Sequence, residues 1–202
     1  MKKSTPAIAE YTARSRADWR NWLSENHLIA QNLYLVIYRK SSPSFSMSVD
    51  EAIDEALCFG WIDSTPKKRD EESYCILFAR RNPKSNWSAV NKKKIAKLTK
   101  AGLMEAEGIR MVKLAKKSGT WTALDEVEKG IVPPDLLSAF STNKKAREYW
   151  DKFPPSVKRG ILEWIGNAKR PETRAARIKE TVTSAEVNIR ANFPRQPKNA
   201  AG

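Results

Sequence analysis

The sequence has very little of the chemistry on which most metal and nucleophile sites depend. Its 202 residues include one histidine, His27, and two cysteines, Cys58 and Cys75. Zinc sites take three or four Cys and His ligands at short spacings, and these three residues lie 31 and 17 positions apart. We therefore predict no metal site, and we expect both cysteines to be buried thiols in apolar segments.

Glycine-rich loops and long apolar runs are also missing. The eight glycines are scattered and form neither a dinucleotide-binding nor a P-loop pattern, so we predict no nucleotide cofactor and name no catalytic residue. The longest apolar run, Leu33–Tyr38, is far shorter than the roughly 20 residues of a membrane helix. Residues 4–16 are too charged for the apolar core of a secretory signal, and we expect a cytoplasmic protein.

Positive charge is abundant and unevenly distributed. The chain has 37 Lys and Arg against 23 Asp and Glu, a net charge of +14, and its 41% of hydrophobic residues suffices for a core. Residues 66–117 and 139–202 are strongly basic, whereas residues 118–138 are acidic and contain Pro133 and Pro134. The predicted organisation is an α+β domain (1–120), an acidic connector (121–138), a helical C-terminal subdomain (139–190) and a flexible tail (191–202).

Periodicity predicts the α+β class, with a small antiparallel sheet and helices before the helical subdomain. Alternating β-branched and aromatic residues predict strands at 33–38, 61–63 and 74–78, with a hairpin-like loop at 66–73. Helical spacing predicts helices at 18–24, 87–99 and 104–117, and three more at 143–153, 157–168 and 173–182. Ser48 and Glu51 fit a capping box that begins a helix ending at Gly60.

Two segments could form a binding pocket. Trp61 and Asp63 lie on the same side of a predicted strand, where they could offer a ligand an aromatic wall and a carboxylate. The alternative is that Trp61 is a core residue and Asp63 caps a turn. An enzyme with Asp63 as general base is a further alternative, although no nucleophile, metal or cofactor motif accompanies it.

The second segment is Phe78–Asn91. Arg80 and Arg81 leave a strand just before a helix that Ser85 or Asn86 could cap, and a helix N-terminus beside two guanidinium groups suits a carboxylate or phosphate. Strand pairing would bring them near Trp61. The predicted anion-binding pocket thus comprises Trp61, Asp63, Arg80, Arg81, Trp87 and Asn91. An Arg–Asp salt bridge that fixes the junction is the alternative.

Basic stripes suggest a different function. Arg170, Arg174 and Arg177 recur on one helical face, and such a stripe either binds phosphates or is an ordinary solvated surface. The alternative function is therefore nucleic-acid binding through Lys92, Lys93, Lys94, Lys97, Arg170, Arg174 and Arg177.

Several segments between Asp18 and Val182 resemble one protein family. They are Trp19 and Trp22, Leu33–Tyr38, Glu55–Asp63, Arg80–Arg81 with Ser85–Asn91, and Ala168–Ile178. These residues resemble the YdeI/OmpD-associated family, also called bacteriocin-protection proteins. The resemblance implies a stress-related role in survival of cationic antimicrobial peptides, and it transfers no catalytic residue.

A protein of charge +14 repels a cationic peptide at long range, so direct capture of such a peptide is unfavourable. We therefore expect a non-enzymatic binding protein whose partner is a small anionic ligand or an envelope component.

Overall fold

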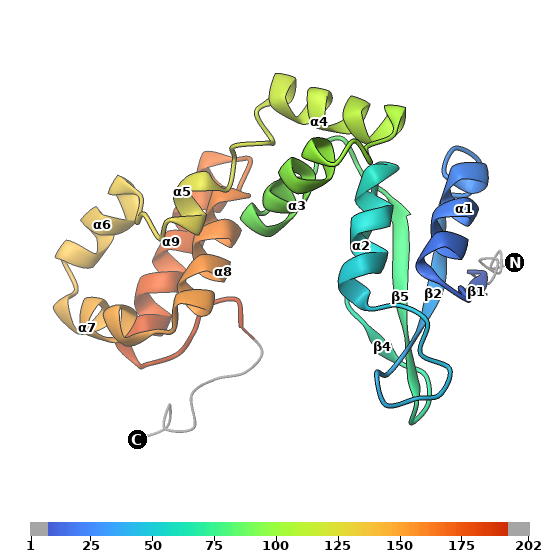
Figure 1. Ribbon diagram of the computed structural model, residues 1–202. Helices are drawn as coiled ribbons and strands as arrows, with labels where there is room; N and C mark the ends of the chain where they lie inside the picture. Colours follow the sequence, from blue (N-terminus) through green and yellow to red (C-terminus); the bar gives the residue numbers. More distant parts are fainter. Residues whose placement is uncertain (1–7, 194–202) are drawn as a thin grey trace, which may run out of the picture. The chain divides into compact units, whose positions relative to one another are not determined.

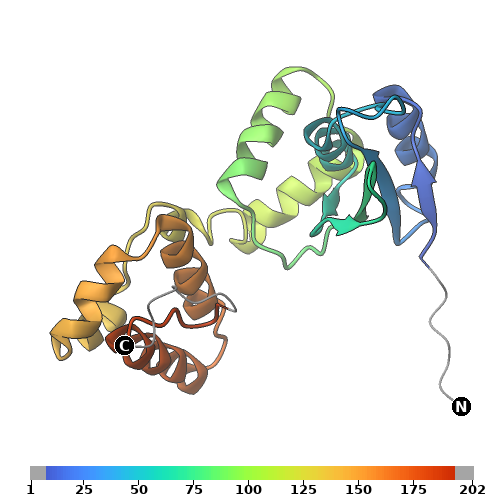
Figure 2. The same cartoon turned by 90° about the horizontal axis from the view of Figure 1, so that it is seen from below.

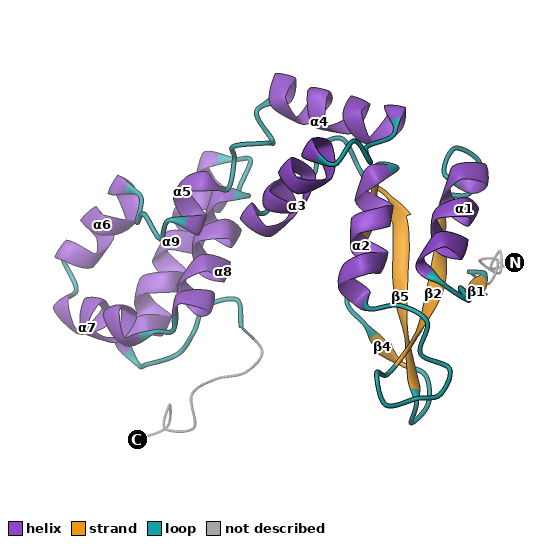
Figure 3. Cartoon of the chain, viewed as in Figure 1, coloured by secondary structure: helices purple, strands orange, loops and turns teal. Residues whose placement is uncertain are grey.

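The computed structural model describes residues 8–193 and divides the chain into two compact units, with the division between Ala123 and Leu124. Figure 1 follows the chain through both units, and Figure 3 shows that the strands all belong to the first. The α+β class predicted from the sequence is confirmed. Among the residues described, no helix is both long and apolar enough to cross a membrane.

The first unit is built on a five-stranded sheet. Its strands are β1 (Glu10–Thr12), β2 (Asn32–Tyr38), β3 (Trp61–Asp63), β4 (Lys67–Lys68) and β5 (Ser73–Arg80). The order is β1-β2-β5-β3, with β4 also paired to β5. All pairs with β5 are antiparallel, as predicted, but β1 runs parallel to β2, so the sheet is mixed.

Helices α1 (Arg16–Asn26) and α2 (Val49–Cys58) lie side by side on one face of the sheet (Figures 1 and 2). Trp19 and Leu23 of α1 pack with Leu35 of β2 and Phe78 of β5 in one buried cluster, because alternate strand residues point to the same face. The predicted capping box of α2 is present, with Ser48 and Glu51 bonded reciprocally. Burial of this apolar face holds the two layers together.

Helices α3 (Ala89–Lys100) and α4 (Ala106–Ser118) complete the first unit. Ile95, Leu98, Met111 and Ala115 join the same core cluster. The first turn of α4 lies directly against the end of α2, and a Cβ added at Gly108 would come within 2.1 Å of the carbonyl oxygen of Cys58. This close approach places the N-terminal turn of α4 beside β3.

The second unit is helical. It contains α5 (Asp125–Glu128), α6 (Pro134–Ser141), α7 (Lys144–Lys152), α8 (Pro155–Gly166) and α9 (Pro171–Glu186). Helix α9 packs against α6, α7 and α8 around a separate core that includes Leu136, Trp150, Ile161 and Ile165. Pro155 and Pro171 stand at first helical positions, where a missing N–H costs nothing.

Three details differ from the sequence prediction. The segment predicted as an acidic connector, residues 121–138, contains α5 and the start of α6, and Leu136 is buried in the second core. Helix α3 is capped by Ser88, neither by Ser85 nor by Asn86. Of the predicted flexible tail, residues 194–202 lie outside the described residues.

Candidate functional site

The candidate site forms where β3 pairs with the end of β5. Trp61 lies opposite Arg80 in the register, and the N–H of Arg81 donates to the carbonyl of Gly60, 3.0 Å away. The pairing thus joins the two segments that the sequence analysis singled out. Gly60 has φ +73°, a left-handed conformation that turns the chain sharply from α2 into β3.

Arg80 is held by backbone carbonyls. Its Nε donates to Ala30 O at 2.8 Å, and its Nη2 donates to Leu28 O. The structure therefore does not contain the alternative Arg–Asp salt bridge: among the described residues, Arg80 has no ion pair with Asp63. The side chain instead ties the end of β5 to the loop between α1 and β2, and this fixes its guanidinium at the rim of the site.

Arg81 is the most unusual residue of this region. Only 6% of the residue's surface is exposed, and its Cζ lies 3.7 Å from the ring centroid of Trp87. One terminal nitrogen donates to Asn86 O, whereas its Nε has no hydrogen-bond partner among the described residues. Burial lowers the pKa of Arg81 to about 10, so the side chain remains charged at neutral pH.

Helix α4 contributes two charged residues of opposite sign. Glu107 and Arg110 lie one turn apart, and two hydrogen bonds of 2.6 Å join the guanidinium to the carboxylate. The bond from Arg110 lowers the pKa of Glu107, and the charges of His27 and Arg80 lower it further. The carboxylate of Glu107 therefore lies close to guanidinium groups from both α4 and β5.

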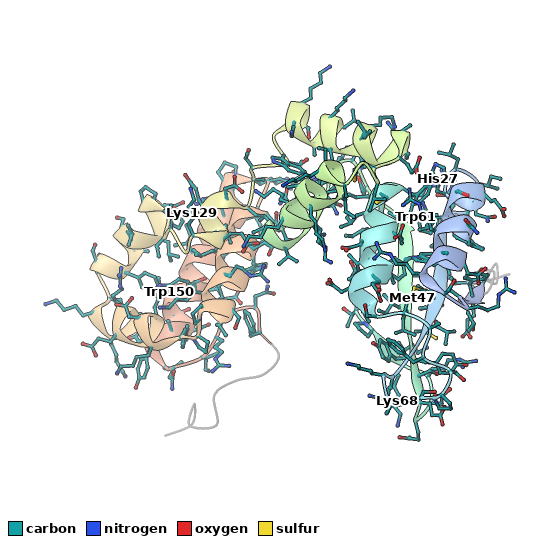
Figure 4. All side chains as sticks on the ribbon, viewed as in Figure 1. His27, Met47, Trp61, Lys68, Lys129 and Trp150 are labelled. Carbon is teal, nitrogen blue, oxygen red and sulfur yellow. The ribbon has the colours of Figure 1, made fainter. Side chains whose placement is uncertain are left out.

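His27 closes the other side. It follows the last residue of α1, where its Nδ1 lies 2.9 Å from Leu23 O, and its ring packs on Phe59 with centroids 5.1 Å apart. The indole Nε1 of Trp61 donates to His27 O at 3.2 Å. Figure 4 shows His27 and Trp61 at the same end of the helical layer, with Lys68 at the opposite end.

These residues surround a cavity of about 330 Å³, which we call the arginine cavity. Its lining combines cations, one carboxylate and apolar side chains: His27, Leu28, Phe59, Gly60, Trp61, Arg80, Arg81, Pro83, Glu107, Arg110 and Met111. Such a mixture of apolar wall and a few polar groups is typical of small-ligand sites.

The structure brings together three of the six predicted site residues, Trp61, Arg80 and Arg81. The other three do not line the cavity. Trp87 is buried beneath Arg81 as its stacking partner, and the N–H of Asn91 donates to Ser88 in the cap of α3. Asp63 stands outside the cavity lining and acts on Arg81 only through its charge.

Sequence reasoning missed Glu107, Arg110 and the position of His27. A basic residue just after a helix, such as His27, is explained by its favourable interaction with the helix dipole alone. A Glu and an Arg three positions apart, such as Glu107 and Arg110, are common on the solvated face of a helix. The available signal was Gly108, because a glycine inside a predicted helix marks a close approach to another backbone. That approach is what brings α4 to the cavity.

Several residues of the alternative nucleic-acid-binding set form ion pairs or hydrogen bonds within the protein. Lys94 pairs with the buried Asp54 at 2.6 Å, and Arg174 pairs with Asp135 at 2.6 Å. Arg177 donates to Trp164 O. Lys93, Lys97 and Arg170 are exposed, and Lys92 lies 5.9 Å from the ring of Trp121.

A larger cavity of about 580 Å³ lies in the second unit, between α6 and α9. Its wall is mostly apolar, with Ile178 and Val182 along one side. The one arginine that lines it, Arg174, is already paired with Asp135. Within residues 8–193 no group of three or more His, Cys, Asp and Glu side chains could hold a metal ion. Cys58 and Cys75 are buried, and neither forms a disulfide.

Comparison with known families separates the same two parts of the chain. Residues 11–111, half of the 202, match a domain of unknown function, DUF8412, and residues 129–188 match the family described as Bacteriocin-protection, YdeI or OmpD-Associated. Neither a curated protein nor a solved structure matches the chain significantly.

The family predicted from the sequence is thus confirmed in the second unit. The motifs around Trp61 and Arg80, which the resemblance also included, fall in the segment matched by DUF8412. The chain therefore belongs to the DUF8412 family, whose model matches half of its length, and residues 129–188 of its C-terminal unit match the model of the YdeI/OmpD-associated, bacteriocin-protection family.

Proposed function

We propose that the first unit binds a small anion, a carboxylate or a phosphate, in the arginine cavity, and that the chain acts by binding. The observation that carries the proposal is Arg81, a buried guanidinium that lines the cavity while its Nε lacks a partner among the described residues. Two further arginines, Arg80 and Arg110, line the same space.

A buried cation destabilises a fold unless a counter-charge or hydrogen bonds compensate the lost hydration. Arg81 has the face of Trp87 and one backbone carbonyl, and among the described residues it has no carboxylate at ion-pair distance. An anion in the cavity would supply the missing counter-charge, and arginine offers planar, bidentate recognition of carboxylate and phosphate. The cavity therefore fits an anion better than a neutral molecule.

This proposal agrees with a role in bacteriocin protection only if that role is indirect. The net charge of +14 repels a cationic peptide, and the arginine cavity is itself cationic. The ligand would then be a cellular anion or an anionic group of an envelope component. Asp63 lies outside the cavity, so we do not propose it as a general base.

Thermal unfolding tests the proposal. The full chain is melted in phosphate and in chloride at equal ionic strength, together with the variants Arg81→Met and Arg110→Gln. We expect phosphate to raise the Tm of the wild-type protein, Arg81→Met to abolish this increase, and Arg110→Gln to weaken phosphate binding at least about tenfold, since a charge-assisted hydrogen bond contributes roughly 1.5–3 kcal/mol.

Two controls separate binding from folding. Lys113→Gln removes an exposed cation from the same helix, outside the cavity, and should leave the effect of phosphate intact. In chloride, Arg81→Met should melt no lower than the wild-type protein, because an apolar side chain of similar volume replaces an incompletely paired buried charge. Equal stabilisation by phosphate in Arg81→Met and the wild type would exclude the site.

A further inference from the structure

One residue of the arginine cavity is unexpected in a site for a simple anion. Glu107 lines the cavity together with three arginines, and its lowered pKa keeps it ionised at neutral pH. A carboxylate in this position repels a bound anion and weakens its binding. The presence of Glu107 therefore suggests a ligand that carries a positive group as well as a negative one.

Glu107 has capacity for a second partner. Arg110 uses one hydrogen bond to each carboxylate oxygen, both of 2.6 Å, and a carboxylate has about four lone-pair sites. Its side chain is 22% exposed, so it can be reached from the cavity. Arg81, the residue after β5, and Glu107, in the first turn of α4, line the cavity from different segments, so the site offers opposite charges from separate walls.

The remaining wall is apolar. Leu28 is 63% exposed and Pro83 is also exposed, whereas Phe59 and Met111 are buried. An exposed leucine beside a charged cavity gains by covering the apolar part of a ligand. The volume of about 330 Å³ lies at the lower end of the range typical of small-ligand sites, which suits a molecule with only a few non-hydrogen atoms.

We propose that the arginine cavity binds a free α-amino acid with an apolar side chain. Its carboxylate lies against Arg81 and its ammonium group donates to Glu107, while the side chain contacts Leu28 and Met111. This inference rests on the proposed anion-binding function, because the carboxylate of the amino acid is the anion.

Calorimetric titration of the full chain with four related probes tests it. L-leucine carries both charges, N-acetyl-L-leucine lacks the ammonium group, L-leucinamide lacks the carboxylate, and 4-methylpentanoate lacks the amino group entirely. We expect L-leucine to bind at least tenfold more tightly than each of the other three.

The variant Glu107→Gln identifies the residue responsible. We expect it to weaken L-leucine at least tenfold and to leave N-acetyl-L-leucine unchanged or more tightly bound, because a repulsive carboxylate is removed. Glu71→Gln is the matched control, since Glu71 forms a similar ion pair with Lys68 three residues away, outside the cavity.

The outcomes distinguish the two proposals. If N-acetyl-L-leucine and 4-methylpentanoate bind as tightly as L-leucine, the amino-acid inference is wrong and the anion site stands. If Glu107→Gln binds L-leucine as tightly as the wild-type protein, the role of Glu107 is wrong. If neither these carboxylates nor phosphate bind, both proposals fail.

Discussion

At the scale of single residues, two glycines allow the close backbone approaches beside the arginine cavity. Gly60 turns the chain with a positive φ, and an added Cβ there would lie 3.0 Å from the Cγ of Met111. Gly108 allows α4 to approach the end of α2 at backbone distance. Glu107 and Arg110 reach the cavity only because this approach is so close.

Gly108→Ala should therefore destabilise the first unit. The new methyl group would lie 2.1 Å from Cys58 O and 2.9 Å from Leu57 O, and backbone atoms cannot move aside as a flexible side chain can. We expect a loss of roughly 3 kcal/mol, at the upper end of the cost of overpacking, measured by urea unfolding.

Ile109→Ala provides the comparison on the same helix. Ile109 is 41% exposed, and alanine is a good helix former, so its substitution should change the free energy of unfolding by less than about 0.5 kcal/mol. Equal stability of Gly108→Ala and the wild-type protein would show that α4 does not pack on α2 in this way.

At the scale of elements, α1 illustrates how local electrostatics fix a helix start. Ser15 caps the helix by accepting from the N–H of Asp18, and Asp18 accepts in turn from the backbone and side chain of Arg14. These bonds lower the pKa of Asp18 from 3.8 to about 2, the side-chain bond of Arg14 being the largest cause. The carboxylate also lies in the positive end of the helix dipole.

The stabilising effect of Asp18 should depend on pH. Because its pKa is lower in the folded protein, the contribution is complete above the unfolded value of 3.8 and is lost as the pH falls through about 2. Asp18→Asn should thus lower the Tm at neutral pH, and the difference from the wild-type protein should shrink below about pH 4.

Arg14→Gln tests the cause of this pH dependence. It removes the guanidinium group that donates to the carboxylate of Asp18. The Tm of this variant should therefore change less than that of the wild type when the pH falls from 4 to 2, by the same linkage. A difference between Asp18→Asn and the wild-type protein that stays constant over this range would contradict the assignment.

Helices and strands with a clear pattern in their own sequence were predictable, whereas elements that depend on a pairing partner distant in the sequence were not. The strand at 33–38 and the capping box of α2 are local patterns, and both occur as predicted. Strand β1 has three residues and exists because it pairs with β2 in parallel, which no local signal reveals. Helix α6 was missed because Pro133 and Pro134 indicate a boundary, whereas Pro134 begins the helix.

The site was predictable to the extent that strand pairing is. Trp61 lies opposite Arg80 because the two strands form a hairpin-like pair. Three of the six predicted residues line the cavity for this reason. Arg110 and Glu107 come from α4, after a helix and two loops, so their position depends on tertiary packing. Trp87 and Asn91 were assigned to the pocket as members of the segment Phe78–Asn91, and the sequence of that segment does not tell which of its side chains are buried.

At the scale of the whole molecule, the two units have separate cores. The first cluster draws its buried residues from positions 13–115 and the second from positions 136–185. The family matches, at 11–111 and 129–188, fall on the same two segments. Each unit has its own buried apolar cluster, which is the physical requirement for independent folding.

Fragments divided between Ala123 and Leu124 should therefore each fold. We expect residues 1–123 and residues 124–202 each to show the circular dichroism of its own unit and a cooperative thermal transition, since neither loses a member of its buried cluster. Residues 1–88 serve as the control. This fragment lacks Ile95, Leu98 and Met111 of the first core, so it should not melt cooperatively. An unfolded 1–123 fragment would mean that the arginine cavity requires the second unit, and a folded one allows ligand binding to be measured on the first unit alone.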